Sequence, residues 1–279
     1  MPDRASSERR DLSLTALYTA GAWQAFGLPG SDLLASDEAA RVFRVVNFAL
    51  RIARFFRPGP VLRETLRHRH ALIDHLVEQS EAPLVLELAA GLSPRGLWLS
   101  GRGREAVEVD LPDLMATKRR LLERSEAGRA ALARTGLRLV SGDVFEVDFD
   151  ALLSRPGPVC VVAEGLLVYL EPAARRTLYE KVARLLARRS GDFVFDLLPP
   201  AEEPPPGLVG QLLAWLMRRA TGGADFDRTP ETREAIRRAL LEAGFTSVTT
   251  YEPATHPALV PRPDAPSQTL VWRATVRER

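Results

Sequence analysis

The stretch Leu84-Val-Leu-Glu-Leu88, followed at once by Ala89-Ala-Gly91, joins a short apolar run to a turn of small residues. A run of this length that ends near glycine predicts a strand buried on both faces, as in parallel sheets covered by helices. Further short runs follow, with helix-like sequence between several of them. They are residues 106–110, 137–140, 159–163 and 193–195. The alternation predicts an α/β fold with a doubly wound, mostly parallel sheet.

The C-terminal part of the chain adds two candidate strands, Ser247–Tyr251 and Thr269–Thr275, which bring the predicted sheet to seven strands. Five prolines lie between these two runs. We therefore expect no helix there and predict that the two strands are antiparallel neighbours. Other helices of this half are expected at residues 113–134, at residues 172–189 and from Thr229 to Gly244.

The first 80 residues have a different pattern, with apolar residues at helical spacing and no strand-like run. Breaks at Gly27-Leu-Pro-Gly30 and Pro58-Gly-Pro60 divide this part into three helices, and Ser36 is a candidate N-cap of the second. The chain is therefore predicted to consist of an N-terminal helical region, residues 1–80, and a sheet domain, residues 81–279.

Residues 199–228 form a candidate insertion in the sheet domain. A proline-rich segment leads into an apolar, helix-like stretch that contains Trp215. The insertion follows the fifth strand at its carboxyl end, where open parallel sheets bind their ligands. We predict that it is a helical lid and that Trp215 contacts the substrate; the alternative is a helix that packs on the core.

Composition excludes several classes of protein. Of the 279 residues, 46% are hydrophobic and 27% are charged, which is ordinary for a globular domain. The 38 basic residues are interspersed with 36 acidic ones, so we expect no nucleic-acid partner. No apolar run reaches the ~18 residues of a membrane span. The N-terminus resembles no secretory signal and Cys160 is the lone cysteine, so we expect a cytoplasmic protein.

Acidic residues stand at the ends of several predicted strands. Because the carboxyl ends of parallel strands meet at one edge, Glu87, Asp110, Asp143 and Glu164 are expected to converge there. Gly91 precedes Asp110 by 19 residues, the spacing that places a carboxylate on a ribose diol. Asp143 could accept from an adenine amine, so an adenosine-containing ligand is predicted. Glu87 has a second interpretation, in which it pairs with an arginine or caps backbone amides.

Two kinds of cofactor contain adenosine and fit such an edge. A dinucleotide requires G-x-G-x-x-G for its pyrophosphate, whereas this sequence has Ala89, Gly91 and Pro94 at those positions. S-adenosylmethionine has no phosphate, and its sulfonium and ammonium charges suit a carboxylate-rich site. The residues therefore favour S-adenosylmethionine.

The four histidines give no metal-binding pattern. His68 and His70 are two residues apart on a helix and diverge, while His75 and His256 complete no ligand set. We predict no metal site and expect solvated or capping histidines.

Three segments together resemble a known family. They are Val85-Leu-Glu-Leu-Ala-Ala-Gly-Leu-Ser-Pro-Arg95, Glu108-Val-Asp-Leu-Pro112 followed by Lys118, and Ala163-Glu-Gly-Leu-Leu-Val-Tyr-Leu170. They are similar, in order, to motifs of the leucine carboxyl methyltransferase-like family of class I S-adenosylmethionine-dependent O-methyltransferases. That family includes bacterial enzymes of polyketide and other secondary metabolism. Arg69, five residues before Asp74, resembles the family's Arg…Asp helix.

The resemblance implies a class I methyltransferase fold with added N-terminal helices, and it implies a role for each matching residue. Arg69 would bind the methionine carboxylate of the cofactor and Gly91 would let the backbone approach the methionine moiety. Asp110 would hold the ribose and Asp143 would face the adenine. Glu164 would lie near the ammonium and the sulfonium. Glu87 is included among the candidate cofactor contacts and Tyr169 among the substrate contacts.

The sequence departs from the family in the first motif. The family usually has Gly where Ala89 stands and an Asp-Thr pair where Ser93 and Pro94 stand. Because Gly91 is retained, the departure at Ala89 is expected to be tolerated.

The predicted activity is S-adenosylmethionine-dependent O-methylation of a small-molecule or carrier-bound metabolite, with a polyketide-type acceptor as one candidate. No compelling general base is present in the sequence, which favours a carboxylate or an acidic phenol over an ordinary hydroxyl. No catalytic residue is assigned. The alternatives are a dinucleotide-dependent oxidoreductase and a non-catalytic protein that binds S-adenosylmethionine.

Overall fold

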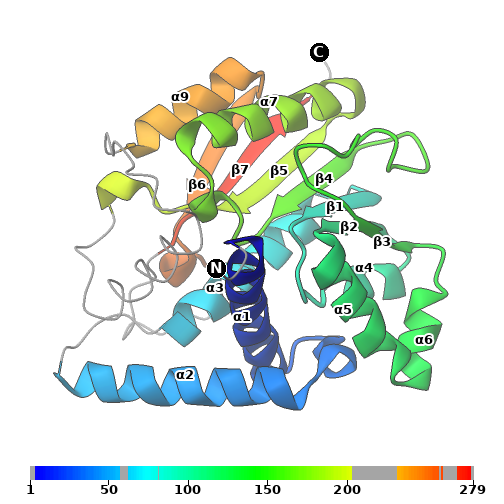
Figure 1. The fold of residues 1–279 in the computed structure, drawn as a ribbon. Helices are drawn as coiled ribbons and strands as arrows, with labels where there is room; N and C mark the ends of the chain where they lie inside the picture. Colours follow the sequence, from blue (N-terminus) through cyan, green and yellow to red (C-terminus); the bar gives the residue numbers. More distant parts are fainter. Residues whose placement is uncertain are drawn as a thin grey trace.

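The computed structural model describes residues 4–56, 62–80, 82–202, 231–257, 259 and 269–277. Its centre is a seven-stranded sheet in the order β3-β2-β1-β4-β5-β7-β6 (Figure 1). The strands are β1 (Leu84–Leu88), β2 (Glu105–Asp110), β3 (Leu137–Ser141), β4 (Val159–Ala163), β5 (Gly191–Asp196), β6 (Ser247–Tyr251) and β7 (Val271–Val276). The first five are parallel, and β7 runs antiparallel to both β5 and β6. The predicted fold class is confirmed.

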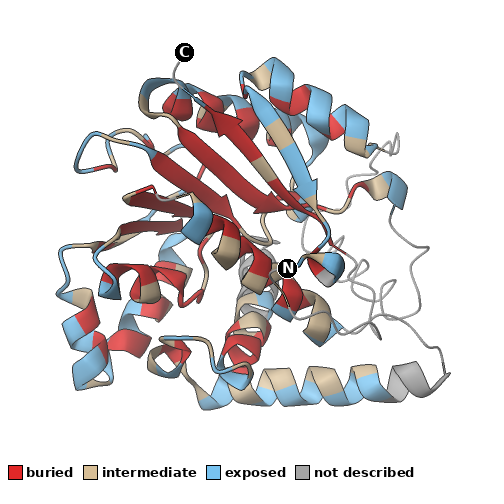
Figure 2. Ribbon diagram, turned by 180° about the vertical axis from the view of Figure 1, so that it is seen from behind, coloured by how far each residue is buried: buried red, intermediate tan, exposed pale blue. Residues whose placement is uncertain are grey.

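The strand order explains the apolar runs. β1 lies between β2 and β4, and all five of its residues are buried, as are those of β4 (Figure 2). β6 is at the edge and is mostly exposed, so its sequence is more polar. The chain winds outward from β1 to β3 and then returns to β4. The switch point, where open sheets bind ligands, therefore lies between the carboxyl ends of β1 and β4.

Helices cover both faces of the sheet. One face packs against α7 (Pro172–Arg189) and α9 (Arg233–Ala243), with Leu86, Val161 and Leu178 in the shared core. The other packs against α3 (Leu62–Gln79), α4 (Arg95–Gly101), α5 (Pro112–Glu123) and α6 (Glu126–Leu132). Because side chains alternate along a strand, Glu87 and Glu108 point to this second face, toward α3 and α4.

Two helices precede α3. They are α1 (Arg4–Ala25) and α2 (Asp37–Phe56), which pack against one another. The Ser36 hydroxyl accepts from the amide of Ala39 at 3.1 Å, so the predicted N-cap is present. Figure 1 shows α1 rising from α2 toward the carboxyl ends of the central strands. α3 packs directly on the sheet, and the division of the chain at residue 80 stays a prediction.

Several predicted elements differ from the structure. The expected helix 113–134 is two helices, because the Ser125 hydroxyl accepts from the amide of Gly128 at 3.0 Å and starts a new one. The short helix α4 was not predicted. A 3-10 turn, Pro253–Thr255, forms in the proline-rich segment where no helix was expected. α9 begins later than the expected Thr229, at Arg233, because the Thr232 hydroxyl accepts from the amide of Ala235 at 3.2 Å and caps the helix there, and it ends before Gly244, as predicted.

The predicted lid lies almost wholly outside the described residues. Of residues 199–228, the structure describes only 199–202, where Pro200–Glu202 form a 3-10 turn. Trp215 is not among them, so the lid and its substrate contact stay predictions.

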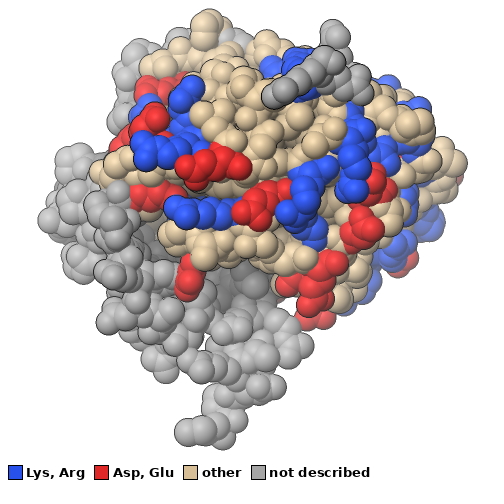
Figure 3. Space-filling model, turned by 90° about the horizontal axis from the view of Figure 1, so that it is seen from above, with Lys and Arg blue, Asp and Glu red and all other residues tan. Residues whose placement is uncertain are grey.

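The described surface has no large region of one charge on the face shown in Figure 3, where basic and acidic side chains lie side by side. Arg188 and Arg189 on α7, for example, both contact Asp150, at 3.6 and 2.6 Å. No helix among the described residues is both long and apolar enough to cross a membrane.

Candidate functional site at the carboxyl edge of the sheet

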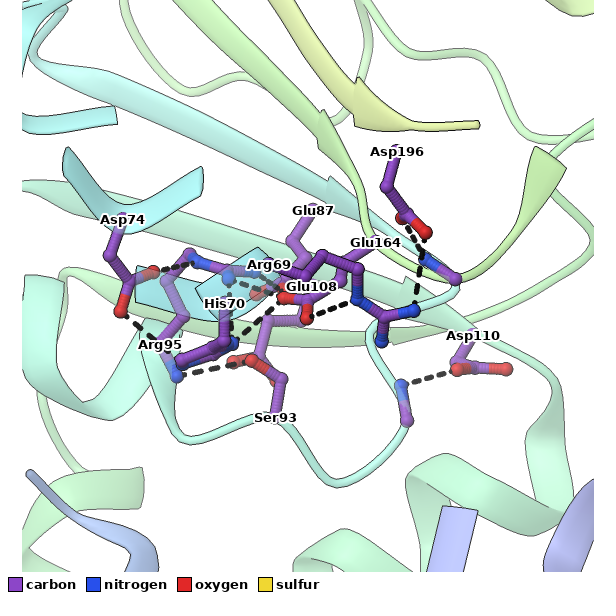
Figure 4. A network of polar contacts seen from close by, with 12 residues as sticks. Arg69, His70, Asp74, Glu87, Ser93, Arg95, Glu108, Asp110, Glu164 and Asp196 are labelled. Atoms are coloured by element: carbon purple, nitrogen blue, oxygen red, sulfur yellow. Dashed lines mark hydrogen bonds and ion pairs between the residues drawn. The ribbon is translucent and has the colours of Figure 1, made fainter. Parts of the chain in front are cut away.

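The turn after β1 is held open beside the end of β2. The amide of Gly91 donates to Asp110 Oδ2 at 2.5 Å (Figure 4). The amide of Leu111 donates to Oδ1 at 2.7 Å. Burial raises the pKa of Asp110, and these amides oppose that effect. Gly91 has a φ of +50°, and a Cβ there would meet nothing within 4 Å. The space beside the turn is therefore open to a ligand.

Asp143 follows the end of β3, two residues beyond Ser141, which pairs with Asp110 in the sheet. The amide of Gly142 donates to the carbonyl oxygen of Asp110 at 2.9 Å, which ties the end of β3 to the end of β2. Asp143 is exposed and its Oδ1 accepts from the amide of Phe145 at 2.8 Å. Its Oδ2 has no hydrogen-bond partner among the residues that the structure describes.

Glu164, just after β4, is held by three nitrogen-bearing side chains. Arg69 Nε lies 3.1 Å from its Oε1, while Arg95 Nη2 and His70 Nδ1 lie 2.6 and 2.8 Å from its Oε2. Burial alone would raise the pKa of Glu164, but His70, Arg69 and Arg95 together hold it well below its usual value. Glu164 is therefore an ionised carboxylate at the switch point.

Arg69 reaches the same edge from α3, as predicted. Its Nη1 lies 3.1 Å from Asp196 Oδ2 at the end of β5, and Asp196 Oδ1 accepts from the amide of Gly165 at 2.5 Å. Its Nη2 has no partner among the described residues and faces the turn at Gly165. Arg69 is thus placed to bind an anionic group, while Asp196 is a site residue that sequence reasoning missed.

Arg95 is the largest omission of the sequence analysis. Its side chain is fully buried and contacts three carboxylates: Asp74 at 2.6 Å, Glu164, and Glu87. Glu87 is 3% exposed, and its pairing with an arginine is the second interpretation raised for it. A signal existed, because a glutamate inside an apolar strand requires a cation nearby and Arg95 begins the next helix. Direct contact of Glu87 with the cofactor stays a prediction.

His70 corrects the expectation of solvated or capping histidines. It is 2% exposed, and its ring stacks on Trp23 of α1 with centroids 4.3 Å apart. Its Nε2 lies 3.2 Å from Asp74 Oδ2, on the opposite side of the ring from Glu164. The expectation was wrong because α3 packs against the sheet on this side, which buries His70 within the ion network.

The side chain of Lys118 stabilises the turn that follows β1. It is fully buried, donates to the carbonyl oxygen of Ser93 at 2.6 Å and pairs with Glu108. Burial raises the pKa of Glu108 to about 7, although Lys118 opposes the shift. The motif Glu108…Lys118 therefore supports the shape of the turn that contains Gly91.

Tyr169 lies in the 3-10 turn Leu167–Tyr169 that follows Glu164. It is half-buried and is hydrogen-bonded to Thr15 of α1. Burial raises its pKa, and Arg69 opposes the shift. Its contact with a substrate stays a prediction.

The charges of the edge are unbalanced among the described residues. Two arginines, Arg69 and Arg95, face four carboxylates in the network. The carboxylates are Asp74, Glu87, Glu164 and Asp196. A pyrophosphate would be repelled by this excess, whereas a ligand with ammonium and sulfonium charges would be attracted. Together with the open turn at Gly91, the residues fit S-adenosylmethionine.

The sheet order and this edge define the class I methyltransferase fold. A solved structure of a candidate O-methyltransferase from Nostoc punctiforme matches with a TM-score of 0.50 at 17% identity, over 82% of this chain and 68% of that one. At that identity the likeness shows the fold alone. The sequence model of leucine carboxyl methyltransferase matches residues 29–183, which is more than half of the chain. The chain belongs to the leucine carboxyl methyltransferase family, and the resemblance stated above is confirmed.

Two curated relatives have informative names. A Parafrankia protein named as a candidate S-adenosyl-L-methionine-dependent methyltransferase is 33% identical over 199 residues, 62% of this chain and 63% of its own length. The tetracenomycin polyketide synthesis O-methyltransferase TcmP of Streptomyces glaucescens is 31% identical over 118 residues, 42% of this chain and 40% of its own. The chain thus spans less than two thirds of either relative.

Proposed function

We propose that this protein is an S-adenosylmethionine-dependent O-methyltransferase that acts on a carboxyl or hydroxyl group of a small-molecule or carrier-bound metabolite. The proposal rests on the arrangement of charged residues at the carboxyl edge of the sheet. An ionised Glu164 lies at the switch point beside Arg69, whose Nη2 has no partner among the described residues, and Asp110 lies across the open turn at Gly91. Family membership supports the same class of reaction.

The residues divide the binding of the cofactor between them. Asp110 would receive the ribose hydroxyls and Asp143 the adenine amine, while the exposed Leu111 offers an apolar surface beside the base. Arg69 Nη2 would bind the carboxylate of the methionine moiety and Glu164 its ammonium. When bound, S-adenosylmethionine supplies an electrophilic methyl group on its sulfonium. The protein then contributes proximity and alignment for in-line attack by the acceptor oxygen.

The acceptor is proposed to arrive as an anion. Among the described residues of the edge, His70 is a histidine whose two ring nitrogens both face carboxylates, so it is not placed to deprotonate a substrate. A carboxylate or an acidic phenol needs no general base. Val168, which is 49% exposed on the turn after Glu164, favours an apolar body for the acceptor. A polyketide-type metabolite meets both conditions, and the name of TcmP points the same way.

The proposal places the reaction in the cytoplasm, without a nucleic-acid or membrane partner. Cys160 is the one cysteine of the sequence and is buried, and burial raises its pKa to about 11. Such a thiol is compatible with a reducing compartment. The number of subunits is not part of the proposal.

Calorimetry with S-adenosylhomocysteine and with NAD(P) tests the choice of cofactor. We expect saturable binding of S-adenosylhomocysteine and none of the dinucleotide. The reverse result would establish an oxidoreductase instead. Methyl transfer from labelled S-adenosylmethionine to a panel of aromatic carboxylic acids and phenols then separates an enzyme from a protein that only binds the cofactor. Trp215→Ala tests the lid in the same assay, because a lid contact would raise the acceptor KM and leave S-adenosylhomocysteine affinity within about twofold.

A further inference from the structure

Asp74 occupies a position in the ion network that the proposed function does not use. It lies on α3, and its two oxygens have different partners. Oδ1 accepts from Arg95 Nε at 2.6 Å, and Oδ2 lies 3.2 Å from His70 Nε2. Both partners lie between Asp74 and the sheet, so Asp74 is on the outer side of the network (Figure 4).

The same two partners meet again at Glu164. Arg95 Nη2 and His70 Nδ1 converge on a single oxygen, Glu164 Oε2, at 2.6 and 2.8 Å. Asp74 and Glu164 are thus joined by two parallel bridges, one through a guanidinium and one through an imidazole. Arg95 Nη2 also lies 3.1 Å from His70 Nδ1, so the guanidinium and the imidazole contact one another as well as Glu164.

The two bridges fix the orientation of the Glu164 side chain and also stabilise its negative charge. A single arginine would leave the glutamate free to turn about its side-chain bonds, whereas two donors on Oε2 and Arg69 on Oε1 define the plane of the carboxylate. Trp23 stacks on the ring of His70 and restrains it from the α1 side. The low pKa of Glu164 is consistent with this surrounding of donors.

Asp74 differs from the other members in its exposure. Its side chain is 26% exposed, against 7% for Glu164 and 0% for Arg95. It borders a cavity of about 340 Å³ between α3 and α4, together with Glu78, Trp98 and Arg102. A change at Asp74 can therefore be relieved by water, and among the described residues its contacts toward the cofactor edge run through Arg95 and His70.

We propose that Asp74, His70 and Arg95 are positioning residues that orient Glu164 toward the positively charged amino-acid end of the cofactor, without touching the cofactor themselves. The inference rests on the proposed function, since it concerns the same site. It predicts that a change at Asp74 weakens the binding of the amino-acid moiety alone and leaves the binding of the adenosine moiety intact.

The experiment compares two ligands on one variant. S-adenosylhomocysteine contains the amino acid, while 5′-methylthioadenosine contains the same nucleoside and thioether without it. For Asp74→Asn we expect the S-adenosylhomocysteine affinity to fall about tenfold, as for the loss of a charge-assisted hydrogen bond, and the methylthioadenosine affinity to stay unchanged. Glu78→Gln is the matched control, because Glu78 borders the same cavity and forms an ion pair at 3.0 Å with the exposed Arg102, outside the network around Glu164.

Other outcomes overturn the inference. An equal loss of both affinities, or an unchanged affinity for S-adenosylhomocysteine, would make Asp74 a purely structural residue. If thermal unfolding shows that Asp74→Asn is not folded, the affinities for the two ligands are compared on His70→Gln instead. The expected result is the same: weaker binding of S-adenosylhomocysteine and unchanged binding of methylthioadenosine. A wild-type protein that binds neither ligand refutes the proposed function itself, and the inference with it.

Discussion

The two halves of the carboxyl edge bind their acidic groups in different ways. At the ends of β1, β4 and β5, carboxylates are held by arginine and histidine side chains, and Glu164 alone has three such partners. At the ends of β2 and β3, carboxylates are held by backbone amides, as Asp110 is by Gly91 and Leu111. One half is a buried ion network, and the other is a set of hydrogen bonds from uncharged backbone amides to carboxylates.

The difference matches the two ends of the proposed cofactor. The amino-acid end carries formal charges, and a network with fixed positive and negative groups can bind them with orientation. The nucleoside end offers hydroxyl and amine donors. A carboxylate that is held by backbone amides can accept hydrogen bonds from them. The physical consequence is an asymmetry under mutation. Removing a cation from the ion network leaves a charge buried without a partner, whereas removing Asp110 leaves two backbone amides that water can reach.

Arg95→Met is expected to have the largest effect, on stability. It leaves Glu87 and Glu164 buried with a partner missing, which typically costs about 3–5 kcal/mol of unfolding free energy. Arg102→Met is the control seven residues further on, because Arg102 is 62% exposed and its surface ion pair with Glu78 contributes no more than ~1 kcal/mol. Urea unfolding of both variants measures the difference. Equal small losses would show that the network is not what holds this half together.

Asp110→Ala is expected to act chiefly on binding. Loss of charge-assisted hydrogen bonds to the ribose should weaken S-adenosylhomocysteine binding by at least roughly tenfold, and loss of two amide partners should lower stability by about 1 kcal/mol. Asp148→Ala is matched, because Asp148 also accepts from two backbone amides, those of Asp150 and Ala151. It should show the stability loss without the binding loss. Unchanged affinity in Asp110→Ala would remove the ribose role.

The nucleoside half was more predictable from sequence than the ionic half. Gly91 and Asp110 are connected by strand, turn and spacing, which are local features. The ionic half joins distant segments, because Arg69 and Glu164 are 95 residues apart and Arg95 and Glu164 are 69 residues apart. Strand-end position placed Glu164 at the edge, and family resemblance gave Arg69 its role. Glu87 within an apolar strand was a local signal for Arg95, whereas nothing local distinguished His70 from the other histidines of the chain.

The same contrast applies to the fold. β1, β4 and β6 were predicted with the observed bounds, because each is a short run with clear stops. The division between α5 and α6 was missed, since a single hydroxyl at Ser125 decides it within a continuous helical pattern. Contacts of α1, such as Trp23 on His70, depend on how three helices pack, which periodicity does not determine.

Glu108 lies between the two halves of the edge, and its role can be tested by the pH dependence of protein stability. It is the neighbour of Glu87 across β1 and β2, but it is paired with a lysine, and burial raises its pKa from 4.5 to about 7. An acid whose pKa is raised on folding favours the folded state when protonated. Its contribution to stability is therefore present below about pH 4.5 and is lost as the pH rises through about 7. Glu108→Gln should flatten this part of the stability–pH curve. A variant with the wild-type slope would mean that Glu108 titrates normally.

The smallest effect is expected at Ala89, in the turn that both halves share. Ala89 has a φ of +52°, in the left-handed region that costs a residue with a Cβ roughly 1–2 kcal/mol. Ala89→Gly relieves this strain but makes the unfolded chain more flexible by about 0.5–1 kcal/mol. The net result should be a stabilisation of less than about 1 kcal/mol, at a position where the family usually has glycine.

Ala90→Gly provides the comparison for that small change. Ala90 is 5% exposed and has no positive φ. The same substitution there makes the unfolded chain more flexible and removes a buried methyl group, without relieving any strain. It should therefore destabilise the protein by about 1 kcal/mol. Chemical denaturation of the two variants gives the sign of each effect. If Ala89→Gly were destabilising to the same extent as Ala90→Gly, the left-handed backbone at Ala89 would not be strained. The turn would then be held by its ties to Asp110 and Lys118 rather than against a local preference of the chain.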